Sequence, residues 1–207
     1  ADGLNLSPEH SDQSSGMGDF HRQFHIPVPV TEKTLVAARR HRKLGAIEGI
    51  RHFEQGARLQ FGEVTVETIP TPHDGVDGVA FVVDDGQQRL GILTDLGHVF
   101  EGLKDVIASL DAVILESNYD PVMLSRGTYP EAIKQRIRGA GGHLSNRECA
   151  ELLDRAATGR LKWICLAHLS GENNTPEKSL GAHREVLGAR YELLVAGRDA
   201  TTDVLEI

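Results

Sequence analysis

The chain has few cysteines and no long apolar segment. Cys149 and Cys165 are the only cysteines among 207 residues, which excludes a framework of several disulfides. Both lie in patterns typical of small buried apolar residues. No run of about 18 apolar residues occurs, so no transmembrane helix is predicted, and the polar N-terminal stretch lacks the apolar region of a signal peptide. We therefore expect a cytoplasmic protein that does not enter a membrane.

Positive charge is also scarce. The chain carries 22 Lys and Arg residues against 30 Asp and Glu residues, a formal net charge of -8. This balance argues against broad, non-specific coating of nucleic acid. A local basic patch can still follow a phosphate backbone, and a solvated helix face explains the same residues equally well. The candidates for such a patch are Arg126, Lys134, Arg136, Arg138 and Arg147.

Length and composition predict one folded domain, residues 1–207. A chain of 207 residues can bury a substantial core. Its hydrophobic fraction of 40% and charged fraction of 25% are ordinary for globular proteins.

The order of predicted elements changes midway along the chain. The first half reads as hairpins, and Asp84-Asp85-Gly86 is a strong turn signal between two of the strands. The second half alternates strands and helices, and Ser145 with Glu148 forms a predicted capping box. Strands are predicted at 28–30, 59–61, 64–68, 79–83, 90–93, 112–115, 163–167 and 191–196, and helices at 13–24, 31–43, 99–110, 130–138, 145–156 and 176–187. Such an order predicts a sheet sandwich covered by helices.

Isolated residues of metal-ligand type follow apolar, β-type runs or end them. Rigid strands that feed short loops are where folds place metal ligands, and scattered His and Asp residues suit a catalytic zinc, manganese or iron site. A carboxylate such as Asp95 is costly to bury without a partner, which a metal supplies, although a helix cap is the alternative. The candidate ligands are His10, Asp12, His73, Asp95 and His168. The histidines that match no motif, expected to be at the surface or locally bonded, are His21, His25, His41, His52, His98 and His183.

Three further stretches complete a family pattern. They are residues 115–120 (Leu-Glu-Ser-Asn-Tyr-Asp), 142–146 (Gly-His-Leu-Ser-Asn) and 167–174, which contains Ala-His-Leu-Ser and Glu-Asn-Asn. With the candidate ligands, the chain resembles the metallo-β-lactamase superfamily and within it the YycJ (WalJ) branch, whose members are exonucleases acting on DNA. The resemblance implies an α+β fold, the αβ/βα four-layer sandwich.

The resemblance also implies a chemistry. Two divalent metal ions, zinc or manganese, would be held by His10, Asp12, His73, Asp95 and His168. Asp12 would orient the attacking hydroxide, while His143 would contact phosphate or protonate the leaving oxygen and Glu116 would orient His143. Nucleic acid, DNA rather than RNA, is the implied partner. The implied substrate-binding residues are Ser145, Asn146 and Asn173.

The first motif departs from the family pattern. The family's His-x-His-x-Asp-His corresponds here to residues 8–13, where Pro8 and Gln13 replace the first and last histidines. The motif also begins within ten residues of the N-terminus, so the chain is expected to lack the opening strands. We expect reduced metal occupancy and weak hydrolysis. Two alternatives stay open: a non-catalytic homologue that binds nucleic acid or a partner, and a hydrolase of a small phosphodiester or thioester.

Overall fold

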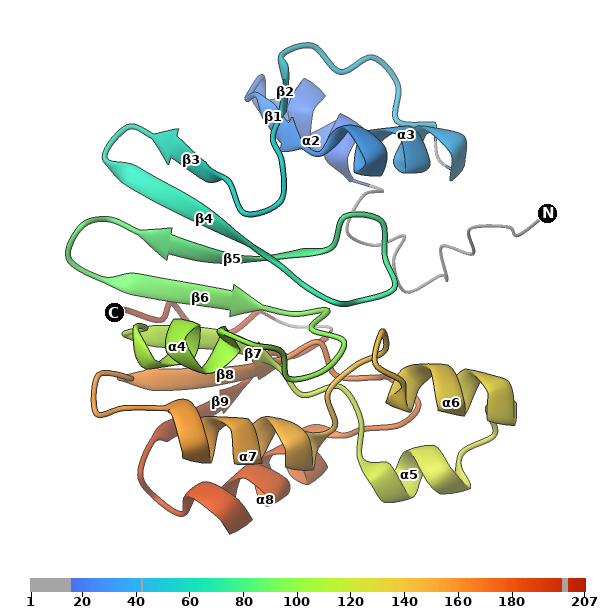
Figure 1. The fold of residues 1–207 in the computed structure, drawn as a ribbon, viewed down its shortest axis with the longest axis vertical. Coiled ribbons are helices and arrows are strands. Elements are labelled where there is room, and N and C mark those ends of the chain that lie inside the picture. Colours follow the sequence, from blue (N-terminus) through green and yellow to red (C-terminus); the bar gives the residue numbers. More distant parts are fainter. Residues whose placement is uncertain (1–15, 42, 199–200) are drawn as a thin grey trace.

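A computed structural model describes residues 16–41, 43–198 and 201–207 and contains a large sheet that runs through the molecule (Figure 1). Within these residues the strands form a seven-stranded sheet in the order β3-β4-β5-β6-β7-β8-β9 and a separate two-stranded sheet, β1-β2. The strands of the large sheet are Arg58–Phe61 (β3), Val64–Pro70 (β4), Val79–Asp84 (β5), Arg89–Leu93 (β6), Ala112–Glu116 (β7), Trp163–Ala167 (β8) and Glu192–Val195 (β9).

The sheet changes from antiparallel to parallel at β6. The pairs β3–β4, β4–β5 and β5–β6 are antiparallel, whereas β6–β7, β7–β8 and β8–β9 are parallel. Two reversals separate β4 from β6, so these strands run in the same direction. The carboxyl ends of β4, β6, β7 and β8 therefore meet at one edge of the sheet.

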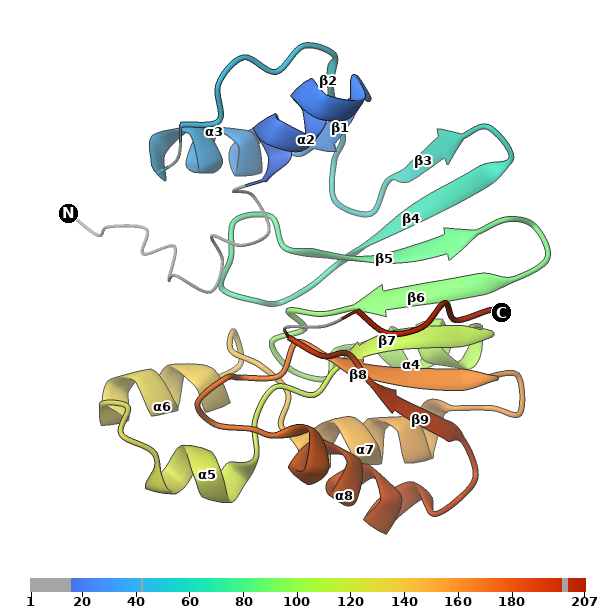
Figure 2. The same cartoon turned by 180° about the vertical axis from the view of Figure 1, so that it is seen from behind.

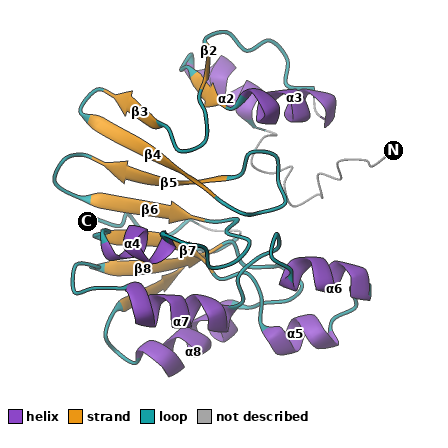
Figure 3. Cartoon of the chain, in the orientation of Figure 1, coloured by secondary structure: helices purple, strands orange, loops and turns teal. Residues whose placement is uncertain are grey.

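Helices cover one face of the parallel half of the sheet (Figures 1 and 3). Side chains alternate across a strand, so Val113 and Leu115 of β7 and Ile164 and Leu166 of β8 enter the main core. The helices that contribute to this core are Leu103–Ala108 (α4), Asn146–Ala156 (α7) and Pro176–Leu187 (α8). Pro121–Arg126 (α5) and Glu131–Arg138 (α6) lie beyond the carboxyl edge.

The opposite face carries a smaller cluster. Ala112, Trp163 and Cys165 point to this side, and residues Leu205 and Ile207 of the C-terminal segment pack against them. Figure 2, which views this face, shows the segment in front of the sheet, where it runs along β6 and β7. A hydrogen bond from the indole of Trp163 to the carbonyl of Glu206, 2.9 Å long, holds the segment there.

The N-terminal elements form a unit at one end of the sheet, next to β3 (Figure 1). The unit contains Met17–Phe24 (α2), Val28–Val30 (β1), Glu32–His41 (α3) and Ile50–His52 (β2). β1 and β2 are parallel. The core of the unit consists of four buried residues, Val30, Leu35, Ala38 and Leu44, and is far smaller than the main core.

Most predicted elements are present at nearly the predicted bounds. The capping box of Ser145 and Glu148 is confirmed at the start of α7, and both cysteines are buried. The helix predicted at 99–110 is shorter, because Gly102 precedes α4 with a φ of 83° that regular helix does not allow. The short elements β2 and α5 were not predicted. No helix among the described residues is long and apolar enough to cross a membrane.

Candidate metal centre

Four chemically active residues lie at the carboxyl edge of the sheet because four strands end there. His73 follows β4, Asp95 follows β6, Glu116 ends β7 and His168 follows β8. His143 joins them from the loop between α6 and α7. Residues far apart in sequence therefore converge, four of them by strand direction and His143 through its loop.

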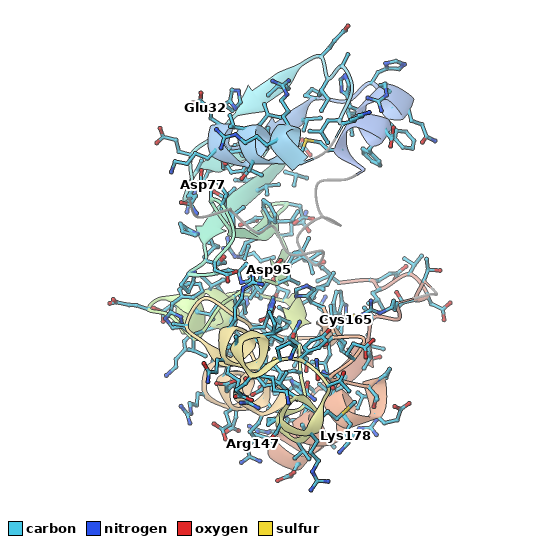
Figure 4. All side chains as sticks on the ribbon, turned by 90° about the vertical axis from the view of Figure 1, so that its right-hand side faces the viewer. Glu32, Asp77, Asp95, Arg147, Cys165 and Lys178 are labelled. Carbon is cyan, nitrogen blue, oxygen red and sulfur yellow. The ribbon has the colours of Figure 1, made fainter. Side chains whose placement is uncertain are left out.

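The convergence brings the side chains of these residues together at one point. Ligand atoms of Asp95, Glu116, His143 and His168 all lie within 4.8 Å of one another. Asp95 Oδ1 lies 3.5 Å from His73 Nε2 and 3.8 Å from Nδ1 of both His143 and His168. Asp95 is therefore the residue that links His73 to the other histidines. Figure 4 views the molecule from the side of this edge and shows Asp95 near the middle.

Glu116 is fully buried and accepts hydrogen bonds through both carboxylate oxygens. Oε2 accepts from Nδ1 of His143 and of His168, both at 3.0 Å, and from the backbone N–H of Asp95 at 3.0 Å. Oε1 accepts from the N–H of Leu144 at 2.8 Å. Burial by itself raises the pKa of Glu116, but the hydrogen bonds and charges of the two histidines outweigh burial and lower this pKa to about 2. Glu116 is therefore ionised and orients its neighbours.

These bonds also determine which histidine nitrogens can serve as ligands. An ionised Glu116 can only accept, so His143 and His168 donate from Nδ1, and Nε2 is left as the basic nitrogen. His73 has the same arrangement, because its Nδ1 donates to the carbonyl of Gly142 at 2.8 Å. A carboxylate or carbonyl behind each imidazole is the usual support of metal-binding histidines. The donor set thus fits a divalent metal ion.

Two of these residues have an unusual backbone conformation. Asp95 has a φ of 54° and His168 a φ of 55°, the left-handed region that residues with a side chain seldom adopt. Such conformations cost about 1–3 kcal/mol each and cluster at functional sites. The fold holds Asp95 and His168 in strained positions that aim their side chains at the centre.

Two glycines allow the backbone of neighbouring loops to pack closely around His73. A side chain at Gly97 would meet the carbonyl of Ala140 at 2.7 Å and the N–H of His73 at 3.1 Å, and one at Gly142 would meet the carbonyl of Ile137 at 2.1 Å. Both positions therefore require glycine. The glycine-rich loop presents the Gly142 carbonyl to His73, so it positions a ligand.

A buried polar network lies behind the centre. The side-chain amides of Asn146 and Asn174 bond to each other in both directions, at 2.9 and 2.8 Å. Asn146 also accepts from the hydroxyl of Ser117 at 2.7 Å. Asn174 donates to the carbonyls of Ser117 and Asn118 at 2.8 and 3.1 Å. The network joins the loops that follow β7 and β8 to the start of α7.

The residues predicted to bind substrate take part in this scaffold. Asn146 is fully buried in the network, Ser145 caps α7, and Asn173 is 1% exposed with its carbonyl accepting from the N–H of Asp120. These bonds account for all three residues without a ligand. Their contact with substrate stays a prediction, and a scaffold role is the simpler interpretation.

The predicted basic patch is largely engaged in local pairs. Arg136 bonds to Asp74 at 2.6 and 2.9 Å, and Arg147 bonds to Glu151 at 2.7 Å. Lys134 is buried and donates to a backbone carbonyl. These pairs favour the interpretation of solvated helix faces over a continuous track for phosphates.

Several histidines outside the motifs have local partners, as expected. His21, His52 and His98 bond to backbone groups. His183 differs from a surface residue, because it is fully buried in α8, where Nδ1 bonds to the carbonyl of Ser179 at 2.8 Å. His10 and Asp12, together with Pro8 and Gln13, lie outside the described residues.

The comparisons with known proteins agree with this geometry. Residues 1–164 match the family described as the β-lactamase superfamily domain. The chain belongs to the metallo-β-lactamase superfamily. It is 34% identical over 187 residues to exodeoxyribonuclease YycJ of Bacillus anthracis, covering 89% of this chain and 70% of that protein. Exodeoxyribonuclease WalJ of Streptococcus pneumoniae is 34% identical over 180 residues, covering 85% and 66%.

A solved structure supports the fold alone. Zn(2+)-bound PqqB from Methylobacterium extorquens superposes with a TM-score of 0.62 at 16% identity, covering 91% of this chain and 66% of that one. The predicted superfamily and its fold are confirmed. The single domain over residues 1–207 and the roles of individual site residues stay predictions.

Proposed function

We propose that this chain is a metal-dependent phosphodiesterase that degrades DNA from a 5′ end. The observation that carries the proposal is the convergence of His73, Asp95, His143 and His168 on one edge, with Glu116 behind them. The exodeoxyribonuclease names of two relatives supply the substrate class. A cytoplasmic location accompanies the proposal as a prediction.

The protein would hold two divalent metal ions through His73, Asp95 and His168, with His10 and Asp12 completing the set. Imidazole and carboxylate ligands suit zinc and manganese. Bound metal would supply Lewis acidity toward a phosphate oxygen. Asp95 lies between His73 on one side and His143 and His168 on the other, so its carboxylate would be one of the metal ligands.

His143 is the residue proposed to act on the leaving group. Its Nδ1–H is held by Glu116 at 3.0 Å, which fixes the ring and leaves Nε2 to contact a phosphate oxygen or to carry the proton given to the departing oxygen.

The substitution His143→Asn tests this role. The asparagine amide can still donate to Glu116 but cannot transfer a proton, so we expect single-turnover cleavage of 5′-phosphorylated duplex DNA in manganese to fall about 10²–10⁴-fold. Metal content, measured by elemental analysis, should stay unchanged. His25→Asn, at an exposed residue at the end of α2, is the matched control. Full activity of His143→Asn would remove His143 from the mechanism.

Pro8 and Gln13 favour the second candidate, a homologue that binds nucleic acid without cleaving it. Neither residue offers the imidazole found at these positions of the family motif. Changing both to histidine should raise metal affinity and phosphodiesterase activity together if the chain is a weakened enzyme. A double variant that gains metal yet cuts no nucleic acid would favour a small phosphodiester or thioester as the substrate.

A further inference from the structure

A cavity of about 490 Å³ adjoins the metal centre on the side of the N-terminal unit. His73 and Asp95 form part of its wall. The remaining wall is mostly apolar and includes Met17 of α2, Phe53 after β2, and Phe81 of β5. A ligand in this cavity therefore lies directly against two of the residues proposed to bind metal.

The cavity is built by contacts between the N-terminal unit and the loop after β4. The hydroxyl of Thr34 donates to the carbonyl of Val76 at 2.9 Å, and Lys33 pairs with Asp77 at 3.1 Å. Gln55 donates to the carbonyl of Gly78 at 2.9 Å. Figure 4 shows Asp77 between Glu32 of α3 and Asp95. The loop that carries His73 is thus also one wall of the cavity.

The lining favours a neutral occupant over the phosphate chain. Asp77 and Asp95 are its acidic residues, but Asp77 pairs with Lys33 and Asp95 is a proposed metal ligand. No Lys or Arg is among the described residues that line the cavity, and a mostly apolar wall disfavours a charged phosphate. The cavity therefore suits a neutral group attached to the phosphate held at the metal centre.

The size of the cavity and its aromatic lining indicate which neutral group it can hold. Pockets of about 300–1,000 Å³ are typical of small-molecule sites, so the cavity is large enough for one base. Phe53 and Phe81 line it, and aromatic rings are surfaces on which bases stack independently of sequence. A flat, neutral group fits these features.

We propose that this cavity binds the nucleobase next to the phosphodiester held at the metal centre, which is the terminal base for the proposed exonuclease. The inference rests on the proposed function, because it takes the phosphodiester as the group at the metal centre. Phe53 and Phe81, which line the cavity, stack on the base.

The test compares two short single-stranded oligonucleotides, each 5′-phosphorylated and labelled at the 3′ end. One ends in a 5′ thymidine and the other in a 5′ abasic residue. Binding is measured by fluorescence polarisation in calcium, and cleavage is measured separately in manganese. The variants are Phe53→Leu, which keeps an apolar side chain without the aromatic ring, and the control Phe61→Leu on β3, which is 43% exposed and does not line the cavity.

We expect the wild-type protein to bind the thymidine end on the order of tenfold more tightly than the abasic end. Phe53→Leu should remove most of this preference, and Phe61→Leu should keep it. Equal binding of both ends by the wild-type protein, or an unchanged preference in Phe53→Leu, would overturn the inference. In that case, cleavage of both oligonucleotides would leave the proposed function standing.

The same experiment can also reject the proposed function while supporting the cavity assignment. A preference for the base that depends on Phe53, without any cleavage in manganese, would keep the cavity assignment and reject hydrolysis of DNA. Absence of binding to either oligonucleotide would reject both proposals.

Discussion

The parallel half of the sheet and the N-terminal unit contribute to the site in different ways. In the parallel half, β6, β7 and β8 end side by side, and buried bonds of Glu116 and Asn174 hold the loops that follow them. The N-terminal unit has a core of four buried residues and contacts the loop of His73 through single bonds. The first region fixes the reacting groups, and the second forms the wall that we propose contacts substrate.

This difference has a consequence for how the two regions tolerate change. Ligand geometry depends on many buried bonds, each costly to break. The cavity wall depends on a few partly exposed contacts, which are individually weak. Substitutions in the parallel half should therefore affect metal binding and folding together, while substitutions in the N-terminal unit should affect substrate choice with little change in stability.

The largest effect is expected for Glu116→Ala. It removes the acceptor of His143, His168, Leu144 and the Asp95 N–H. Unfolding free energy should fall by about 3–5 kcal/mol, and metal affinity should fall about 10–100-fold. Urea unfolding and metal titration measure the two effects, and Glu185→Ala, at an exposed pair with Arg147, is the control. Unchanged metal affinity would contradict the orienting role of Glu116.

His183 provides a test of the same region through pH. Burial lowers the pKa of His183 to about 4, and the bond to the Ser179 carbonyl opposes this only in part. The unfolded chain binds a proton below about pH 6.5 while the folded chain does not. Stability should therefore fall as pH falls from about 6.5 to 4, by about 1.4 kcal/mol per unit and about 3 kcal/mol in total.

The variant His183→Gln should lack this component. Urea unfolding between pH 7 and pH 4 should show a shallower slope for His183→Gln than for the wild-type protein. His25→Asn, at an exposed histidine, should keep the wild-type slope. Identical slopes for wild type and His183→Gln would show that His183 is protonated in the folded chain.

A smaller effect is expected for Asn174→Ala. The substitution leaves Asn146 without its reciprocal amide partner and removes the donor to two buried carbonyls. Unfolding free energy should fall by about 1–3 kcal/mol. Because the network joins the loops of Glu116 and His168, metal affinity should fall as well. A loss of stability with metal affinity intact would separate the network from the centre.

The smallest effect is expected for Lys33→Ala, in the N-terminal unit. The Lys33 side chain is 76% exposed where it pairs with Asp77. The free energy of unfolding, measured by thermal denaturation, should therefore change by less than about 1 kcal/mol. The base preference in oligonucleotide binding should weaken modestly, because Asp77 loses its fixed position in the cavity wall. If Lys33→Ala lowered the free energy of unfolding as much as Asn174→Ala, the N-terminal unit would be no more tolerant of substitution than the parallel half.

Local sequence determined the elements and the chemical types at their ends. Alternating apolar residues, turn residues such as Asp84-Asp85-Gly86, and the capping pair of Ser145 and Glu148 act over a few residues, so their consequences are readable without the fold. The placement of His73, Asp95 and His168 after strands follows from the same local patterns. The short helix α5, which Asp120 caps and Pro121 begins, was missed because six residues provide little periodicity.

Tertiary structure alone decided how these elements meet. Only the pairing of the strands brings the ends of β4, β6, β7 and β8 to one edge, and only their register lets Glu116 bond to His168 as well as to His143. The burial of Asn146 and the cavity lined by Phe53 and Phe81 likewise depend on contacts across long sequence separations. Such contacts are decided by the packing of whole elements, which no short stretch of sequence encodes.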